Sequence, residues 1–307
     1  MAIEQWLVEQ PKTIDIETVR TVRARLASGA FNVIGHDGPG CRVEVGAVDD
    51  RPIRIAIDGD TLVVDHPQWS WSELPAGARA VVSPPEATLT LLVPRRTELS
   101  IAAMGAEVLA VGVHGRISVR TLAGEVFLDE TEGELAVQTV DGDINVREHT
   151  GALKVRTVSG HLTASGALRE VDARTATGTA NLDVTSGLPD RLQTVTVSGA
   201  TTIRLPRDAN PAYRVKTVTA LAQLDGVVLQ PLHGKTYRTP PHEYASRMSD
   251  VFAATFGGQI TVLRSDRDAE ASGQELRKTL PAGFHDRIDE RVSNATSALA
   301  EGSAIEA

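Results

Sequence analysis

The sequence predicts an all-β protein: a parallel β-solenoid (β-helix) of 18-residue coils, with an N-terminal antiparallel β excursion and a C-terminal helix. One observation is a repeat that starts at Gly115 and recurs at Gly133 and Gly151. Another is alternation within each nine-residue half, as where apolar Ile117 and Val119 lie between polar neighbours. A period of two is typical of strands, and β-branched residues favour them. Short stacked strands with glycine corners follow from these patterns.

Threonines and glycines mark the corners of the repeat. The threonines are Thr121, Thr139, Thr157, Thr175, Thr196, Thr217 and Thr255, and the glycines three residues later are Gly124, Gly142, Gly160, Gly178, Gly199 and Gly258. Ala220 replaces the glycine that would follow Thr217. Threonine hydroxyls satisfy turn backbone, and glycine allows positive φ or the absence of a Cβ. We interpret both series as structural.

The N-terminal region, 1–96, is expected to hold a first coil and capping hairpins. Val22, Ala24 and Leu26, followed by Gly29, fit the repeat. From about residue 35 the chain leaves it, and turn signals separate further strand candidates at 42–45, 53–57, 61–64, 80–82 and 88–93. Antiparallel hairpins that cap the stack are the predicted structure.

The repeat domain, 97–265, is predicted to contain eight coils, each lying on the one before it. Repeats start at 97, 115, 133, 151, 169, 190 and 211, and a longer insertion, 229–248, precedes the last one. At a strand spacing of ~4.8 Å, eight coils would make a rod of roughly 38 Å. Insertions of this kind map to the corners of a stack.

The C-terminal region, 266–307, is predicted to be a linker followed by a helix. Phe284, Ile288, Val292, Ala295 and Leu299 follow helical spacing after Pro281. This apolar stripe is expected either to cap the stack or to contact a partner.

Composition excludes several classes of protein. A net charge of -9 and a pI of about 5.4 argue against nonspecific nucleic-acid binding. Neither a secretory signal nor a run of eighteen apolar residues is present, so we expect a cytoplasmic protein without a membrane span. The lone Cys41 is expected to be a packed side chain.

The motifs of catalysis and of metal or cofactor binding are missing from the sequence. Asp141 and Asp143 are isolated rather than part of a calcium-binding ladder, and the Gly234-Lys235-Thr236 run lacks the earlier glycine of a phosphate loop. We therefore expect no enzyme, no catalytic residue, no metal and no cofactor. The alternative is a polysaccharide-active β-helix enzyme, which would bring two carboxylates together in a cleft.

The distribution of charged residues along the strands indicates a candidate binding face. The first-half strands expose mostly basic residues, and the candidate binding residues there are Arg116, Arg120, Lys154, Arg156 and Arg174. The second-half strands are expected to expose Glu125, Asp129, Asp143 and Asp183. The basic face could dock a protein partner or an anionic polymer through its summed field, or it could be a solvated surface. Trp69 and Trp71 form a second candidate contact, with loop packing as the alternative, and the 229–248 insertion a third.

The corners T-V-S-G and T-V-D-G, the segment SGAFNV and the closing GGQITVLR resemble the bacterial β-strand-repeat family of putative adhesins, also called toastrack-like proteins. The resemblance covers about 19–264. It implies a parallel β-solenoid and, in some members, a role near cell-envelope stress signalling or transcriptional regulators, and it supplies no catalytic residues. The expected function is a non-catalytic intracellular binding or scaffold module; a surface adhesin is a further alternative.

Overall fold

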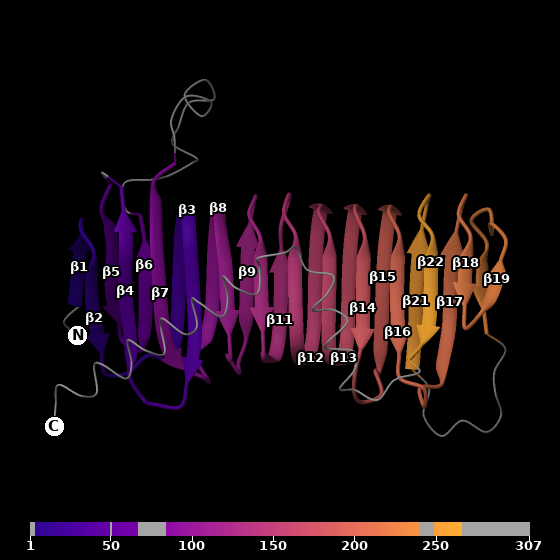
Figure 1. Cartoon of the computed structure of the whole chain (residues 1–307), viewed down its shortest axis with the longest axis horizontal. Coiled ribbons are helices and arrows are strands. Elements are labelled where there is room, and N and C mark those ends of the chain that lie inside the picture. The colour runs from indigo at the N-terminus through magenta and orange to yellow at the C-terminus, as the bar shows by residue number, and fades with distance from the viewer. Residues whose placement is uncertain (1–3, 50, 67–83, 240–248, 266–307) are drawn as a thin grey trace. The chain divides into compact units, whose positions relative to one another are not determined.

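The computed structural model describes residues 4–49, 51–66, 84–239 and 249–265, and every regular element among them is a β-strand (Figure 1). All of these strands belong to one compact unit, Met1–Ser265. The segment for which a helix was predicted falls in the second unit, Asp266–Ala307, which lies outside the described residues.

The central strands pair in parallel with a register of one repeat. Their bounds are β8 (Glu98–Val111), β9 (Ile117–Thr121), β10 (Val126–Asp129), β11 (Glu132–Gln138), β12 (Ile144–Ser159), β13 (Leu162–Thr177), β14 (Ala180–Val184), β15 (Arg191–Ser198) and β16 (Thr201–Leu205). Ile117 lies beside Leu135, and Leu135 lies beside Leu153. Residues one repeat apart in the sequence are therefore neighbours in the hydrogen-bonded sheet. We call each repeat a layer and name it by its first residue, such as layer 115.

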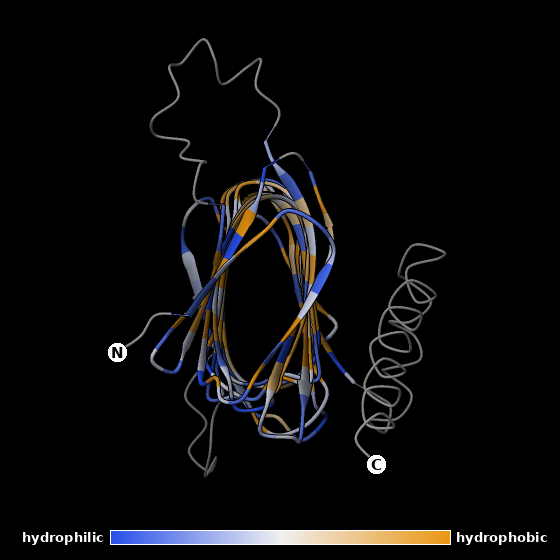
Figure 2. Ribbon diagram, turned by 90° about the vertical axis from the view of Figure 1, so that its left-hand side faces the viewer, coloured by the Kyte–Doolittle hydropathy of each residue, from blue (hydrophilic) through white to orange (hydrophobic). Residues whose placement is uncertain are grey.

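Alternation within each strand places one set of aliphatic side chains inside. Val119, Val137 and Val155 occupy equivalent positions in successive layers and are completely buried. Seen along the stack, the strands superimpose in a flattened oval (Figure 2). Each layer contributes only a few inward residues, so the layers depend on one another for a continuous core.

The N-terminal end combines one parallel layer with antiparallel hairpins. Its strands are β1 (Glu4–Val8), β2 (Lys12–Ile16), β3 (Thr21–His36), β4 (Cys41–Val48), β5 (Ile53–Asp58), β6 (Thr61–Asp65) and β7 (Glu86–Pro94). Strand β3 pairs in parallel with β8 on one side and with β6 and β7 on the other. Antiparallel pairs then follow outward: β5 on β6, β4 on β7, β1 on β5 and β2 on β4. The N-terminal region therefore contains the antiparallel strand pairs that the sequence predicted, and candidate strand 80–82 lies outside the described residues.

The C-terminal end contradicts the expected order of layers. Its strands are β17 (Pro211–Thr217), β18 (Ala222–Leu224), β19 (Val227–Leu229), β20 (Thr236–Arg238), β21 (Ser249–Thr255) and β22 (Ile260–Arg264). Strand β21 pairs in parallel with both β15 and β17, and β22 pairs with both β16 and β18. Layer 249 therefore lies between layers 190 and 211, and the prediction that each coil lies on the preceding one was wrong here.

The 229–248 insertion accounts for this order, because it is long enough to return the chain past layer 211. Strand β21 gains a parallel partner on each side, whereas as a last layer it would have only one. Layer 211 is instead covered by antiparallel β20 on β17 and β19 on β18. An end closed by short antiparallel strands limits edge-to-edge pairing with other chains.

The predicted corners are also present. The hydroxyl Oγ1 of Thr157 donates to the carbonyl oxygen of Ser159 at 3.0 Å, and Thr121 makes the same bond to Ala123 at 2.6 Å. Gly160 follows with a φ of 128°. Buried threonines thus close the turns of layers 115 to 190, while the glycines allow successive layers to approach closely.

Candidate binding face

The first-half strands present three outward columns of side chains. In one column Arg120, Gln138, Arg156 and Arg174 follow one another in parallel register, one per layer. In the neighbouring column Ala136, Lys154 and Asp172 are register partners. The third column contains Arg116 and Glu134, which form an ion pair at 2.8 Å. The stacking thus brings all five predicted basic residues onto one face.

Small side chains make this face concave. Ser118 and Ala136 lie between longer residues, and the resulting groove has a volume of about 580 Å³. Its charged lining consists of Arg116, Glu134, Lys154, Glu170, Asp172, Arg174 and Arg191. Arg120 and Arg156 do not line the groove but lie in the column beside it. An elongated ligand could therefore contact both the groove and this column.

Ion pairs neutralise part of the basic face. Arg116 pairs with Glu134, and Nε of Arg174 donates to Oδ1 of Asp172 at 2.9 Å. Arg214, farther along the face, pairs with Asp250 at 2.8 Å. Among the described residues, Arg120, Lys154, Arg156 and the groove residue Arg191 make no ion pair, so these four carry unbalanced positive charge.

Two carboxylates were wrongly assigned to an exposed acidic face. Asp129 and Asp183 are only 8% and 7% exposed. Their layers place Asp129 beside Arg147 and Asp183 beside Arg204, with ion-pair distances of 3.2 and 3.1 Å. Burial raises the pKa of Asp129 to about 6 and also raises the pKa of Asp183. The contrast in charge between the two faces is therefore smaller than the sequence predicted.

A buried histidine was not singled out from the sequence. His149 is 1% exposed, and its Nε2 lies 3.3 Å from the carbonyl oxygen of Ala152. Because a carbonyl only accepts, Nε2 carries the proton, and Nδ1 accepts from Oγ1 of Thr131 at 3.0 Å. Burial lowers the pKa of His149. Both ring nitrogens are thus occupied, and the residue serves to hold a corner.

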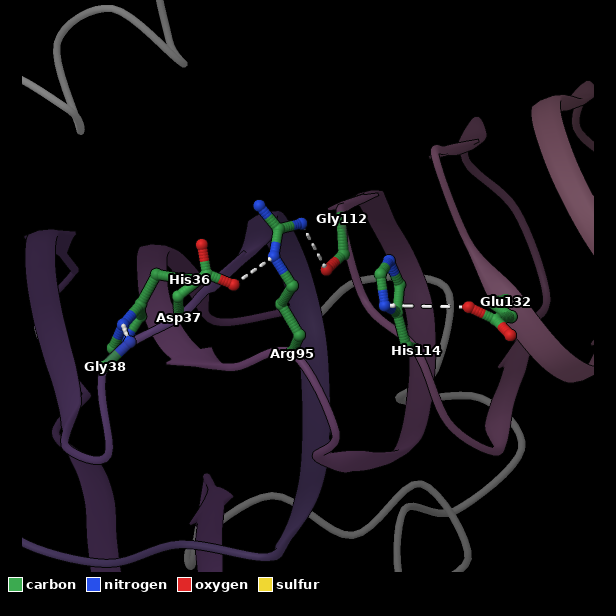
Figure 3. A network of polar contacts seen from close by, with 7 residues as sticks. All are labelled: His36, Asp37, Gly38, Arg95, Gly112, His114 and Glu132. Carbon is green, nitrogen blue, oxygen red and sulfur yellow. Dashed lines mark hydrogen bonds and ion pairs between the residues drawn. The ribbon is translucent and has the colours of Figure 1, made fainter.

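A second polar cluster joins the N-terminal excursion to the repeat (Figure 3). Arg95 donates through Nε to Oδ1 of Asp37 at 2.8 Å and through Nη1 to the carbonyl oxygen of Gly112 at 3.2 Å. Next to it, Nδ1 of His114 lies 3.7 Å from Oε2 of Glu132. These contacts link consecutive corners, which is a structural role.

The other sequence candidates are only partly placed. Trp69 and Trp71 lie outside the described residues, as does 240–248 of the insertion. The described part of the insertion contributes β20 to the C-terminal cap. Within the described residues no group of three or more His, Cys, Asp or Glu side chains could hold a metal ion. No helix in the described ranges has the length and apolar character needed to cross a membrane.

The fold and face define an all-β protein of layered parallel strands with a charged outer groove. Similar solved structures include putative adhesins from Bacteroides fragilis (11% identity, TM-score 0.36, covering 84% of this chain and 98% of that one) and Parabacteroides merdae (11%, 0.37, 86% and 96%). Another is a putative lipid binding protein from Parabacteroides distasonis (9%, 0.32, 84% and 97%). Neither a family model nor a curated protein matches the sequence.

Proposed function

We propose that this protein is a non-catalytic binding module, a β-solenoid whose basic face docks an extended anionic chain such as an acidic segment of a protein or an anionic polymer. One observation carries the proposal: Arg156 and Arg174 are register partners, so their Cα atoms are about 4.8 Å apart. Like charges directly opposite each other destabilise a sheet. Asp172 offsets the charge of Arg174, and a bound anion would offset that of Arg156, which makes no ion pair among the described residues.

The unpaired residues extend this site along the stack. Arg120 lies two layers from Arg156 in the same column. Lys154 lies in the neighbouring column, within the groove. A ligand that follows the column would meet positive charge at intervals of one or two layers. Positive charge repeated along a column suits a chain with repeated negative charges better than a single small anion.

The ion pairs favour binding over polysaccharide cleavage. A glycosidase needs two carboxyl groups across a cleft, one of which donates a proton. In the groove, Glu134 is held by Arg116 and Asp172 by Arg174. Carboxylates committed to arginines are poor proton donors, so we regard the enzyme as the second candidate.

The test reverses charge at two unpaired residues. We expect R120E/R156E to weaken binding to polyglutamate or polyphosphate by at least tenfold, because both charges are exposed and have no ionic partner in the described part of the chain. The control R96E/K235E makes the same change in net charge at exposed residues elsewhere. Equal binding by the two variants would show that the face is only a solvated surface.

Location and partner form part of the same proposal. We propose that the module works inside the cell, in envelope-stress or regulatory signalling, rather than as a surface adhesin. Fractionation of the native cells separates these roles, since an adhesin would be recovered at the cell surface. Affinity purification of the wild-type protein beside R120E/R156E would then identify a partner that depends on the basic face.

A further inference from the structure

A straight line of apolar side chains runs along the glycine corner, immediately after the threonine series. In the order of the layers, this apolar ridge consists of Met104, Leu122, Val140, Val158, Ala176, Val197, Phe256 and Val218. Leu122, Val158 and Phe256 are 49%, 53% and 59% exposed. Every layer from 97 to 211 thus presents an apolar residue at the same position, over about 34 Å at ~4.8 Å per layer.

The corner itself explains why these residues point outward but not why they are apolar. The buried Thr157 bonds to the carbonyl of Ser159, which leaves Val158 between them to project from the turn. The carbonyl oxygen of Val140 accepts from the amide of Ser159 at 2.8 Å, so the backbone is aligned from layer to layer. A polar side chain would fit the exposed position equally well. A contiguous exposed apolar line is typical of an interaction surface.

The two flanks of the ridge differ in charge. On one side, two residues before the ridge, lies the column with Arg120 and Arg156. On the other side lie Glu125, Asp141 and Asp143. Oδ1 of Asp141 accepts from the Ser159 hydroxyl at 2.9 Å, which leaves its negative charge in place.

We propose that the apolar ridge joins two copies of this chain, in parallel and in register, about a two-fold axis that runs along the ridge. Such an axis places the basic flank of each copy against the opposite flank of the other, so that in layer 115 Arg120 lies opposite the partner copy's Glu125. A two-fold axis across the ridge would instead place the basic flanks against each other. Charge complementarity therefore selects the parallel arrangement, in which each ridge residue faces its own equivalent.

The size of the contact sets its strength. A strip of about 34 Å by roughly 15 Å buries about 500 Å² per copy, or ~1,000 Å² in total, which is at the lower limit for a specific interface. Dimerisation should accordingly depend on concentration in the micromolar range or above. The inference goes beyond the anion-binding proposal, because it depends on the apolar ridge and shares only Arg120 with the basic face.

Sedimentation of the full chain without ligand tests the interface. V140S/V158S/V197S should raise the dimer dissociation constant at least tenfold without unfolding the protein, because each side chain is about half exposed. The control V227S/V228S changes two residues of β19 that are equally exposed but lie at the end of the stack, and it should leave dimerisation unchanged. The proposal is overturned if the wild-type protein stays monomeric, whether or not it binds lipid vesicles. It is also overturned if the ridge variant dimerises as the wild type does.

Cysteine cross-linking tests the orientation. Cys41, the sole native cysteine, is 3% exposed, and burial raises the pKa of its thiol to about 12, so it provides a silent background. In the parallel dimer Leu122→Cys and Val197→Cys should each form a disulfide with its own equivalent. In an antiparallel dimer neither residue would face itself. Failure of both variants to cross-link would exclude the proposed axis.

Discussion

The carbonyl oxygen of Gly142 lies 2.3 Å from the position that a Cβ on Gly160 would occupy. The same relationship joins Gly178 to Gly160 at 2.1 Å and Gly199 to Gly178 at 1.8 Å. The glycine at these corners is therefore required by the backbone of the layer below it, whereas Ala220 occupies the position in layer 211. The repeat preserves glycine here because the layers could not otherwise reach hydrogen-bonding distance.

Gly160→Ala should lower the free energy of unfolding by at least about 3 kcal/mol, because it combines a positive φ with a clash against backbone atoms. The matched control is Gly187→Ala. Gly187 has a φ of 74° but no atom within 4 Å of the added Cβ, so only the conformational cost of about 1 kcal/mol applies. Urea denaturation measures both, and equal losses would refute the steric explanation.

Thr157→Val should destabilise the protein by about 1 kcal/mol, because it removes the hydroxyl that donates to Ser159 and leaves that carbonyl without its donor. Thr194→Val should do the opposite. Thr194 is 1% exposed, and within the described structure its hydroxyl has no hydrogen-bond partner. Removing a buried unsatisfied hydroxyl is neutral or stabilising. If both variants lost stability equally in thermal unfolding, the hydroxyl bond would not be the cause.

The free energy of unfolding should fall as the pH rises through the range in which the Asp129 carboxylate titrates. The folded state raises its pKa from 3.8 to about 6, so between these values the native state binds more protons than the unfolded state. The free energy of unfolding should therefore decrease by at most about 3 kcal/mol across this range. Asp129→Asn should lack that decrease, and urea titrations of both proteins at pH 4 and pH 7 measure the difference. A wild-type stability that rose relative to the variant would mean that the pair with Arg147 outweighs desolvation.

Val251→Asp should disturb strands on both sides of β21, because Val251 is completely buried in layer 249. Hydrogen exchange is expected to show lost amide protection in β17 as well as in β21. The control Val43→Asp buries a charge in β4, at the other end of the unit, and should leave β17 protected. Full protection of β17 in the first variant would place layer 249 at the end of the stack instead.

The sequence carried the period, the strand alternation and the corner residues, because each layer repeats the same local constraints. Ile117, Leu135 and Leu153 could be aligned from spacing alone, and the register confirms that alignment. The order of the last layers could not be predicted, since the parallel edges that β21 joins accept a strand from either direction along the chain. The length of the 229–248 insertion does not predict which strand edge the following strand will pair with.

The candidate site was predictable in position but not in charge balance. Alternation sufficed to place Arg156 and Arg174 on one face, whereas the partners of Asp129 and Asp183 depend on which layers become neighbours. The apolar ridge was overlooked because Val158 and Val197 sit between threonine and glycine, whose structural roles dominate those corners. Its exposure emerges only when the turns are folded.

The position of layer 249 also restricts how this protein can change length during evolution. Both ends are closed, one by the N-terminal hairpins and the other by the short antiparallel strands β19 and β20 on layer 211, because layer 249 lies between two earlier layers. A tandem duplication appended after residue 265 would find no open edge on which to pair. Duplication of one repeat within 115–168 would keep both closures intact, so lineages with longer versions should have gained their additional repeats in the interior.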